Sequence, residues 1–346
     1  MLSLDQVARF ESEGYVTLDT SLSPTELDAA EEAFDRLLSA SKKNSDRGAF
    51  QQEEVDGDLN KDPANLADEG SDQYLCFNSN TSRPCYEDVD FLATIAHPFF
   101  EDVAKQVLRT DEVEYIECFP LDRPPTPRPA SGAWPDSREV WAKNCHVDVQ
   151  LTRSDFEASP RRDQLMMWLW LSEVTPESGA MRIMPKSHAR FMTFWEETLL
   201  PERRQWLPRV HGLNPVGGGA AMPSQPEGLP QPIDSSAGPL SWIDREPIAA
   251  TAHRGQMLLH CGAMLHSAWY NQSNESRKGY LLQWIPKAVA GGLEASRIEK
   301  CRSLYPKLRA ALPEGRRHLI PQKCRHFVTG YEDKWPEMFM EMGARR

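Results

Sequence analysis

The stretch GQMLLHCGAMLHSAWYNQSNESRKGYLLQWIP, residues 255–286, contains two apolar runs separated by a polar segment. Residues 255–261 and 277–286 are rich in the bulky apolar side chains that favour strands. Asn271, Ser273 and Asn274 lie between the runs and are typical of a turn. The pattern predicts two strands with a turn before the second. Arg277 opens that second strand, so the turn brings this arginine back towards His266.

A second stretch, NCHVDVQLT at residues 144–152, places His146 and Asp148 two positions apart. We interpret it as a strand, on which side chains at i and i+2 share one face. An imidazole beside a carboxylate suits a divalent first-row metal, and two histidines with one carboxylate leave the opposite side of the metal open. The pair alone is weak evidence, because it is also ordinary polar decoration of a half-buried sheet.

A third ligand should come from a distant strand, and five histidines further along the chain qualify: His188, His211, His253, His260 and His266. Arg277 lies eleven positions after His266, whereas the residue eleven positions after His260 is Asn271. An arginine fork binds a carboxylate through two parallel hydrogen bonds, which is what the distal end of a dicarboxylate such as 2-oxoglutarate requires. The sequence therefore favours His266. We interpret His260 as a packing or supporting residue near the same site.

The composition indicates a globular protein of 346 residues with a net charge of −12. This charge disfavours binding to nucleic acid or to anionic lipid, which both require clustered basic residues. No apolar run is long enough for a membrane span, and the first residues lack the features of a secretory signal. Seven cysteines without a CxxC motif indicate a reducing compartment, so we predict a cytoplasmic protein.

Helical patterns come first along the chain, and strand patterns follow. Helices are predicted over 4–13, from Pro24 with a capping box of Ser23 and Glu26, and over 97–108. The proline-rich run 120–129 is predicted to be a loop, because proline cannot donate to a sheet ladder. Residues 164–174 are predicted to form a strand. Such an order favours an antiparallel sandwich or barrel flanked by helices.

These motifs together resemble one known family. The segments HVD, WLWLSEVTPESGAMRIMPKSH (168–188) and 255–277, together with the opening stretch FESEGYVTLDTSLSPTELDAAEEAFDRLL (10–38), resemble the phytanoyl-CoA hydroxylase family of Fe(II)/2-oxoglutarate dioxygenases. The resemblance implies a mainly β fold with flanking helices and a double-stranded β-helix (jelly-roll, cupin-like) core. It also implies one domain over 1–346: a helical N-terminal part at 1–110, a core at 111–290 with an insertion at about 190–247, and a C-terminal extension at 291–346.

The resemblance also implies site residues and cofactors. His146, Asp148 and His266 match the family's iron ligands, which are its catalytic centre, and Arg277 matches its 2-oxoglutarate arginine. Trp168 matches an aromatic residue that lines the co-substrate pocket. Ser273 lies in a turn that often adds a hydroxyl near the same carboxylate. The implied cofactors are Fe(II), 2-oxoglutarate and O2. Two positions depart from the family pattern: Gln256 replaces an aspartate after Gly255, and Lys186 replaces the glycine of a PGSH turn.

The implied activity is oxidation of an unactivated C–H bond in a small molecule, for example hydroxylation of a natural-product intermediate, with release of succinate and CO2. Asp148 argues against halogenation, because halogenases of this type have a small residue in place of the carboxylate. Two alternatives stay open: desaturation or ring formation on an acyl-CoA or amino-acid derivative, and a jelly-roll binding protein without catalysis. The expected partner is a small-molecule substrate, with neither nucleic acid nor membrane, and the oligomeric state is not predicted.

Overall fold

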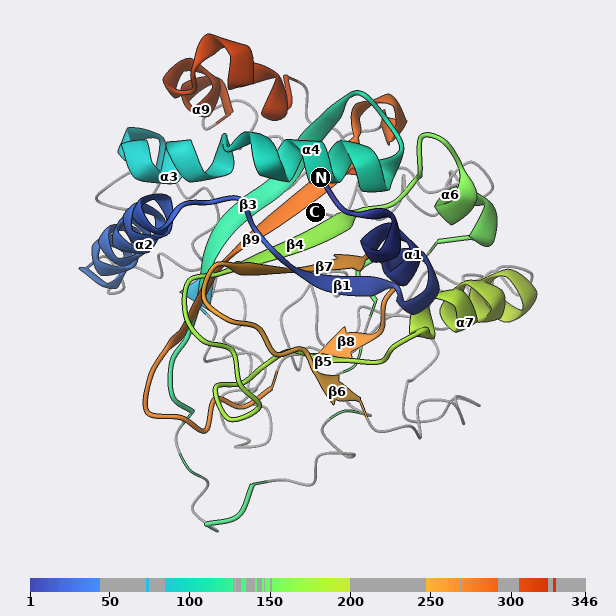
Figure 1. Cartoon of the computed structure of the whole chain (residues 1–346), viewed down its shortest axis with the longest axis horizontal. Helices are drawn as coiled ribbons and strands as arrows, with labels where there is room; N and C mark the ends of the chain where they lie inside the picture. Colours follow the sequence, from blue (N-terminus) through green and yellow to red (C-terminus); the bar gives the residue numbers. More distant parts are fainter. Residues whose placement is uncertain are drawn as a thin grey trace, which may run out of the picture.

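Two antiparallel sheets form the centre of the computed structural model (Figure 1). The larger sheet has the strand order β1-β7-β4-β9-β3-β2, and the smaller one has the order β6-β5-β8. The structure describes residues 1–43, 73–74, 85–126, 128, 132–134, 141, 145, 147–149, 151–199, 247–267, 269–291, 305–322 and 326–327. The predicted insertion at 190–247 and the C-terminal extension at 291–346 therefore lie largely outside the described residues.

The strands of the larger sheet are β1 (Tyr15–Asp19), β2 (Gln73–Tyr74), β3 (Val113–Arg123), β4 (Leu165–Trp170), β7 (Gln256–Cys261) and β9 (Arg277–Pro286). Those of the smaller sheet are β5 (Arg182–Ile183), β6 (Ile248–Ala249) and β8 (His266–Ser267). Another short pair joins β10 (Ala290–Gly291) to β11 (His326–Phe327). From β6 to β9, successive strands alternate between the two sheets, which is the arrangement of a jelly roll.

Helices flank the sheets as the sequence predicts. They are α1 (Leu4–Glu13), α2 (Pro24–Lys43), α3 (Val89–Ile95), α4 (Pro98–Leu108), α6 (Arg153–Glu157), α7 (Ser187–Phe194) and α9 (Tyr305–Ala311). Helix α2 begins at Pro24 with the predicted capping box, in which Glu26 N–H donates to Ser23 Oγ at 3.3 Å and Ser23 N–H donates to Glu26 Oε2 at 2.8 Å. The fold is thus the predicted one, mainly β with flanking helices.

The two faces of the larger sheet have different neighbours, because successive strand residues point to opposite sides. Tyr280 of β9 faces the helices: its hydroxyl donates to Ala30 O of α2 at 2.9 Å, and its ring contacts Phe34 and Phe91. Figure 1 shows α2, α3 and α4 on this side. Arg277 and Gly279 alternate with Tyr280 and so face the other way. That inner face is where the predicted site residues lie.

One strand extends further than the sequence predicts. Strand β3 continues through Pro120 to Arg123, so the loop prediction for 120–129 is wrong at its first four residues. Pro120 pairs with Tyr280 of β9 on one side. On the other side, β2 pairs only with Leu121 and Asp122 among the described residues. A strand with one unpaired edge tolerates the missing N–H of a proline.

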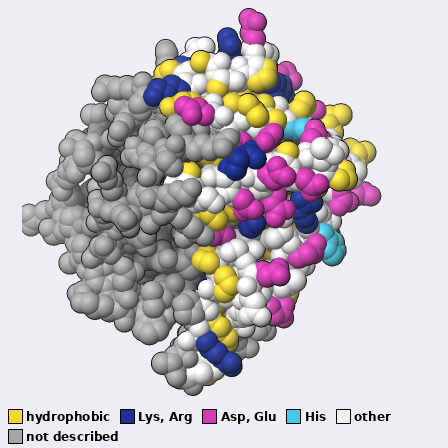
Figure 2. Space-filling model, turned by 90° about the vertical axis from the view of Figure 1, so that its left-hand side faces the viewer, with side chains coloured by type: hydrophobic (Ala, Val, Ile, Leu, Met, Phe, Trp, Pro, Cys, Tyr) yellow, Lys and Arg dark blue, Asp and Glu magenta, His cyan; other side chains and the backbone are white. Residues whose placement is uncertain are grey.

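Acidic and basic side chains lie among one another on one face of the molecule. Figure 2 shows acidic side chains with basic ones among them on the described part of one face. Helix α2 takes part in such pairs: Asp28 and Glu31 contact Arg254, and Asp35 contacts Lys278 at 2.8 Å. Among the described helices, none has the length and apolarity needed to cross a membrane. The single-domain organisation stays a prediction. In its favour, one cluster of buried apolar side chains includes residues from α1, the sheets and α9.

Candidate metal and co-substrate site

Asp148 lies in a bend. Its backbone N–H and that of Val149 both donate to the carbonyl oxygen of Gly262, each at 2.9 Å. Consecutive N–H groups of a strand point in opposite directions, so this geometry is incompatible with a strand. The strand predicted over 144–152 is therefore wrong at Asp148 and Val149. His146 lies outside the described residues.

Asp163 fixes this bend from the far side of Gly262. The N–H of Gly262 donates to Asp163 Oδ1 at 3.0 Å, while its carbonyl receives the two N–H groups of the bend. A Cβ at Gly262 would lie 2.9 Å from a Val149 methyl, so only glycine fits between them. Burial raises the pKa of the Asp163 carboxyl to about 7, although the charge of Arg161 lowers it. Asp163 thus holds the backbone that carries Asp148.

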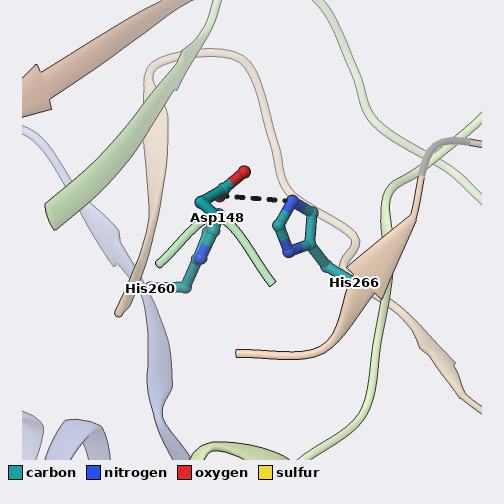
Figure 3. A group of neighbouring side chains, drawn as sticks. All are labelled: Asp148, His260 and His266. Carbon is teal, nitrogen blue, oxygen red and sulfur yellow. Dashed lines mark ion pairs between the residues drawn. The ribbon is translucent and has the colours of Figure 1, made fainter. Parts of the chain in front are cut away.

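His266 of β8 points its ring at Asp148 (Figure 3). Its Nδ1 lies 3.0 Å from Met264 O, which can only accept, so Nδ1 carries a proton and Nε2 is the nitrogen available to a metal. Its Nε2 lies 3.5 Å from Asp148 Oδ2. A carbonyl that fixes the outer nitrogen and orients the inner one is the usual arrangement of a metal-binding histidine.

His260 of β7 joins this group from the larger sheet (Figure 3). Ligand-type atoms of Asp148, His260 and His266 all lie within 4.8 Å of one another. The His260 Nδ1 lies 3.0 Å from Cys261 O, and its Nε2 accepts the indole N–H of Trp168 at 3.1 Å. Burial, followed by the neighbouring His266, holds the pKa of His260 well below its usual value. His260 is therefore a neutral imidazole with both ring nitrogens hydrogen-bonded.

Trp168 and Arg277 lie on the same inner face of the larger sheet. Trp168 of β4 stacks on Trp170 with ring centroids 5.7 Å apart, and the Arg277 guanidinium lies 5.0 Å from the Trp170 ring centroid. Gly279 makes this packing possible, because a Cβ there would lie 2.8 Å from the Trp170 ring. Arg277 is buried and also donates to Gly179 O. A buried guanidinium over an aromatic floor is a suitable partner for a carboxylate.

Ser273 lies in the turn between β8 and β9. Its hydroxyl lies 2.7 Å from Asn271 Oδ1 and 3.0 Å from Glu275 O, and its N–H donates to the same Asn271 oxygen at 3.0 Å. The Asn271 amide in turn donates to the carbonyls of Arg123 and Glu275. These contacts shape the turn that delivers Arg277 to β9. The predicted role of Ser273 beside the co-substrate stays a prediction.

The departures from the family pattern at Lys186 and Gln256 are accommodated by their immediate surroundings. Lys186 has φ +66°, so its backbone keeps the left-handed conformation that glycine favours at this position. Gln256 uses both ends of its amide: Nε2 donates to Asp19 Oδ1 at 2.8 Å, and Oε1 accepts the His253 N–H at 2.9 Å. The strands that carry His260 and His266 are therefore positioned despite both changes.

The described donor groups fit a divalent metal ion. They offer a carboxylate and an imidazole of the required tautomer, the donor types that Fe(II) and its neighbours prefer. Trp168 is linked to this group by its hydrogen bond to His260. Trp168 also stacks on Trp170, and the Arg277 guanidinium lies over the Trp170 ring. Sequence reasoning expected a supporting role for His260 but not its contact with Trp168. It missed Asp163 entirely, because a lone aspartate between strands carries no sequence signal of this role.

The comparison with known families agrees with this geometry. The sequence model of the phytanoyl-CoA dioxygenase (PhyH) family matches residues 10–279 of the chain. No curated protein sequence matches the chain.

Similar solved structures include the following three, each at low sequence identity to this chain. The α-ketoglutarate-dependent carbocyclase SnoK from nogalamycin biosynthesis is 19% identical, with a TM-score of 0.48 over 82% of this chain and 84% of its own. HygX from Streptomyces hygroscopicus, with nickel and 2-oxoglutarate bound, is 12% identical, with a TM-score of 0.46 over 83% and 88%. EctD from S. alaskensis, with 2-oxoglutarate and 5-hydroxyectoine, is 15% identical, with a TM-score of 0.44 over 84% and 78%.

The family match spans most of the chain and includes the segments that carry Asp148, Trp168, His266 and Arg277. The chain therefore belongs to the phytanoyl-CoA dioxygenase family and is a non-haem iron enzyme that depends on 2-oxoglutarate.

Proposed function

We propose that the protein hydroxylates an unactivated C–H bond of a small molecule, using Fe(II), 2-oxoglutarate and O2, and that it releases succinate and CO2. His146, Asp148 and His266 hold the iron in this proposal. Arg277 binds the distal carboxylate of 2-oxoglutarate, with Trp168 lining that pocket and Ser273 beside it. A natural-product intermediate is one substrate class that this chemistry would suit.

The observation that carries the proposal is the pairing of His266 with Asp148. Met264 O lies 3.0 Å from His266 Nδ1, and His266 Nε2 lies 3.5 Å from Asp148 Oδ2. Both donors therefore converge on one point from different elements of the fold. A carboxylate, rather than a small residue, at position 148 supports oxygenation over halogenation.

The surroundings of this point supply binding and exclusion of water. Arg277 is only 3% exposed, so an ion pair between its guanidinium and a carboxylate would be poorly screened by solvent. Trp168 and Trp170 are buried on the same face and keep the neighbouring space apolar. Iron with 2-oxoglutarate and O2 supplies the oxidising power that breaks a C–H bond. The residues of the chain orient the reactants and keep bulk water away.

A binding experiment tests the co-substrate half of the proposal. Anaerobic addition of 2-oxoglutarate to the Fe(II) protein should produce a weak visible charge-transfer band. Asp148→Ala should abolish the band, and Asp111→Ala, which changes an exposed aspartate, should leave it intact. If the wild-type protein gives no band, the proposed function is wrong.

A turnover experiment tests the reaction. Succinate should form from 2-oxoglutarate when a panel of metabolites is supplied, and His146→Ala should give the background rate. Mass spectrometry of the product then identifies the outcome, because hydroxylation adds one oxygen atom, while desaturation or ring closure removes two hydrogen atoms. Binding of a metabolite without any succinate would instead indicate a jelly-roll protein without catalysis.

We also propose that the protein acts in the cytoplasm, without nucleic acid or membrane as a partner. Cys85, Cys145 and Cys261 are buried thiols, and burial raises the pKa of Cys85 and of Cys145 to about 12. Such thiols are unreactive and suit a reducing compartment. Fractionation of the native host cell, followed by detection with an antibody, tests this location.

A further inference from the structure

His260 and His266 present the same chemistry to the same point in space. Each has a backbone carbonyl 3.0 Å from Nδ1, Cys261 O for His260 and Met264 O for His266. Each therefore carries a proton on Nδ1, and Nε2 is the ring nitrogen through which each would bind a metal. Their ring centroids are 4.8 Å apart (Figure 3). The tautomer that prepares His266 to bind a metal thus prepares His260 equally well.

The difference between the two rings is the partner of Nε2. In His266 this atom faces the Asp148 carboxylate. In His260 it accepts the N–H of Trp168 at 3.1 Å. The indole hydrogen bond therefore occupies the atom through which His260 would bind a metal.

We propose that Trp168 is a positioning residue that keeps His260 out of the coordination sphere of the metal, by occupying the His260 Nε2 lone pair. This inference rests on the proposed function, because it assumes that a metal binds at Asp148 and His266. It gives Trp168 a second role beyond lining the co-substrate pocket.

The number of protein ligands decides how many positions on the metal remain for the co-substrates. Three protein ligands on one face leave the opposite face of a six-coordinate metal for the co-substrates. A fourth protein ligand would take one of those positions. Trp168 thus preserves the open face while it allows an imidazole to pack beside the metal.

Because His260 is buried, loss of its hydrogen bond to Trp168 would favour coordination of His260 to the metal. His260 is 0% exposed, so water does not reach its Nε2. Loss of the indole N–H would leave a buried acceptor without a partner, which is energetically unfavourable. A metal ion beside Asp148 and His266 would satisfy that lone pair. The ligand atoms already lie within 4.8 Å of one another, so a small shift of the ring suffices.

Trp168→Phe tests the inference, because it keeps an aromatic ring on Trp170 and removes only the indole N–H. Trp284→Phe is the matched control. Trp284 is also fully buried in the larger sheet, but its N–H has no hydrogen-bond partner among the described residues, and its ring contacts that of Tyr115. Both variants are loaded with Co(II), and the hyperfine-shifted imidazole N–H signals are counted by NMR. Wild type and Trp284→Phe should show signals from His146 and His266 alone.

Trp168→Phe should show one additional imidazole signal, a changed ligand-field spectrum, and Co(II) binding tighter on the order of tenfold, the scale on which outer-shell partners act. The double variant Trp168→Phe with His260→Ala should lose the additional signal and return to the wild-type spectrum. A Trp168→Phe protein with the wild-type signals and affinity would overturn the inference.

His260→Ala alone keeps the inference testable if Trp168→Phe does not fold. With Trp168 intact, this variant should retain the Co(II) spectrum of the wild type. A loss of one imidazole signal would mean that His260 is already a ligand, and the inference would be wrong. Failure of the wild-type protein to bind Co(II), with His266→Ala behaving identically, would instead refute the proposed function, so the two failures are distinguishable.

Discussion

His260 and His266 are six positions apart in sequence but belong to different sheets, β7 and β8. The segment between them is held at two places: Gly262 N–H donates to Asp163 Oδ1 at 3.0 Å, and Leu265 N–H donates to Ser187 Oγ at 2.9 Å. Both rings are buried, both use a carbonyl at Nδ1, and both reach the same point. Composition, burial and tautomer therefore do not distinguish them.

What distinguishes the two histidines is a residue elsewhere in the chain. Trp168 donates to one, and Asp148 faces the other. A histidine here thus becomes a ligand or a packing residue through the neighbour that its inner nitrogen meets. Local sequence around either histidine does not contain that information.

The two histidine variants are expected to differ most in metal affinity. His266→Ala should weaken Fe(II) or Co(II) binding by at least about 100-fold, because even loss of an outer-shell partner typically costs about 10- to 100-fold. His260→Ala should weaken it by less than about tenfold. Titration calorimetry under anaerobic conditions measures both. His253→Ala, at an exposed histidine paired with Glu173, serves as the control. Equal losses for His260→Ala and His266→Ala would break the comparison.

Asp163, which holds the segment that joins the two histidines, should make the free energy of unfolding depend on pH. Its pKa is raised from an ordinary value of 3.8 to about 7 by burial. Between these values the folded protein keeps a proton that the unfolded chain has released, so the free energy of unfolding falls as pH rises through this window. Asp163→Asn keeps an acceptor for Gly262 and does not ionise. The metal-free variant should therefore gain stability relative to wild type between pH 4 and 8, by up to roughly 4 kcal/mol.

Urea unfolding at a series of pH values measures this difference. Arg161 lowers the pKa of Asp163, and Asp148 raises it more weakly, so both charges must be kept in the variant. Parallel stability curves for wild type and Asp163→Asn would show that Asp163 is ionised in the fold at pH 5, contrary to the account.

Arg277 tests the assignment of His266 as the metal ligand, because the sequence favoured this histidine through its spacing to Arg277. Arg277→Ala should weaken 2-oxoglutarate binding by about 100-fold, the value of a charge-assisted hydrogen-bonded pair, while Co(II) affinity stays unchanged. Arg277→Lys should recover part of the loss, because lysine keeps the charge without the fork. The Fe(II) charge-transfer band, titrated with 2-oxoglutarate, gives both constants. Unchanged 2-oxoglutarate affinity in Arg277→Ala would remove the reason for preferring His266.

The smallest effect concerns the support of His266 by helix α7. Ser187→Ala removes the acceptor of the buried Leu265 N–H and should cost about 1–2 kcal/mol of unfolding free energy. Ser12→Ala, at an exposed serine, should change it by less than about 0.5 kcal/mol. Thermal or urea unfolding measures both variants. An unaffected Ser187→Ala protein would show that the turn before β8 is held by other contacts.

Much of the fold follows from local patterns in the sequence. The capping box at Ser23 sets the start of α2, and the apolar run 277–286 matches β9 over its full length. The family motifs also identified the jelly-roll core, which the two sheets confirm. Strand β3 extends further than predicted because Pro120 lies where the strand is paired on one side. That tolerance depends on the length of β2, which no pattern near Pro120 encodes.

The site was predictable only in part, because its geometry depends on long-range contacts. Asp148 was expected in a strand, but the carbonyl of Gly262 gathers two successive N–H groups and forms a bend. Gly262 is itself held by Asp163. The Trp168 contact with His260 joins residues 92 positions apart. Spacing between motifs indicates which residues meet, but the partner of each nitrogen follows only from the packed structure.

Anomalous diffraction from crystals loaded with Co(II) under anaerobic conditions would show directly which histidine binds the metal. We expect one ion bound to His266 Nε2 and to the Asp148 carboxylate at about 2.0–2.2 Å, with His146 completing the set. His260 Nε2 should remain on the Trp168 N–H. An ion bonded to His260 Nε2, with the Trp168 hydrogen bond broken, would contradict the account.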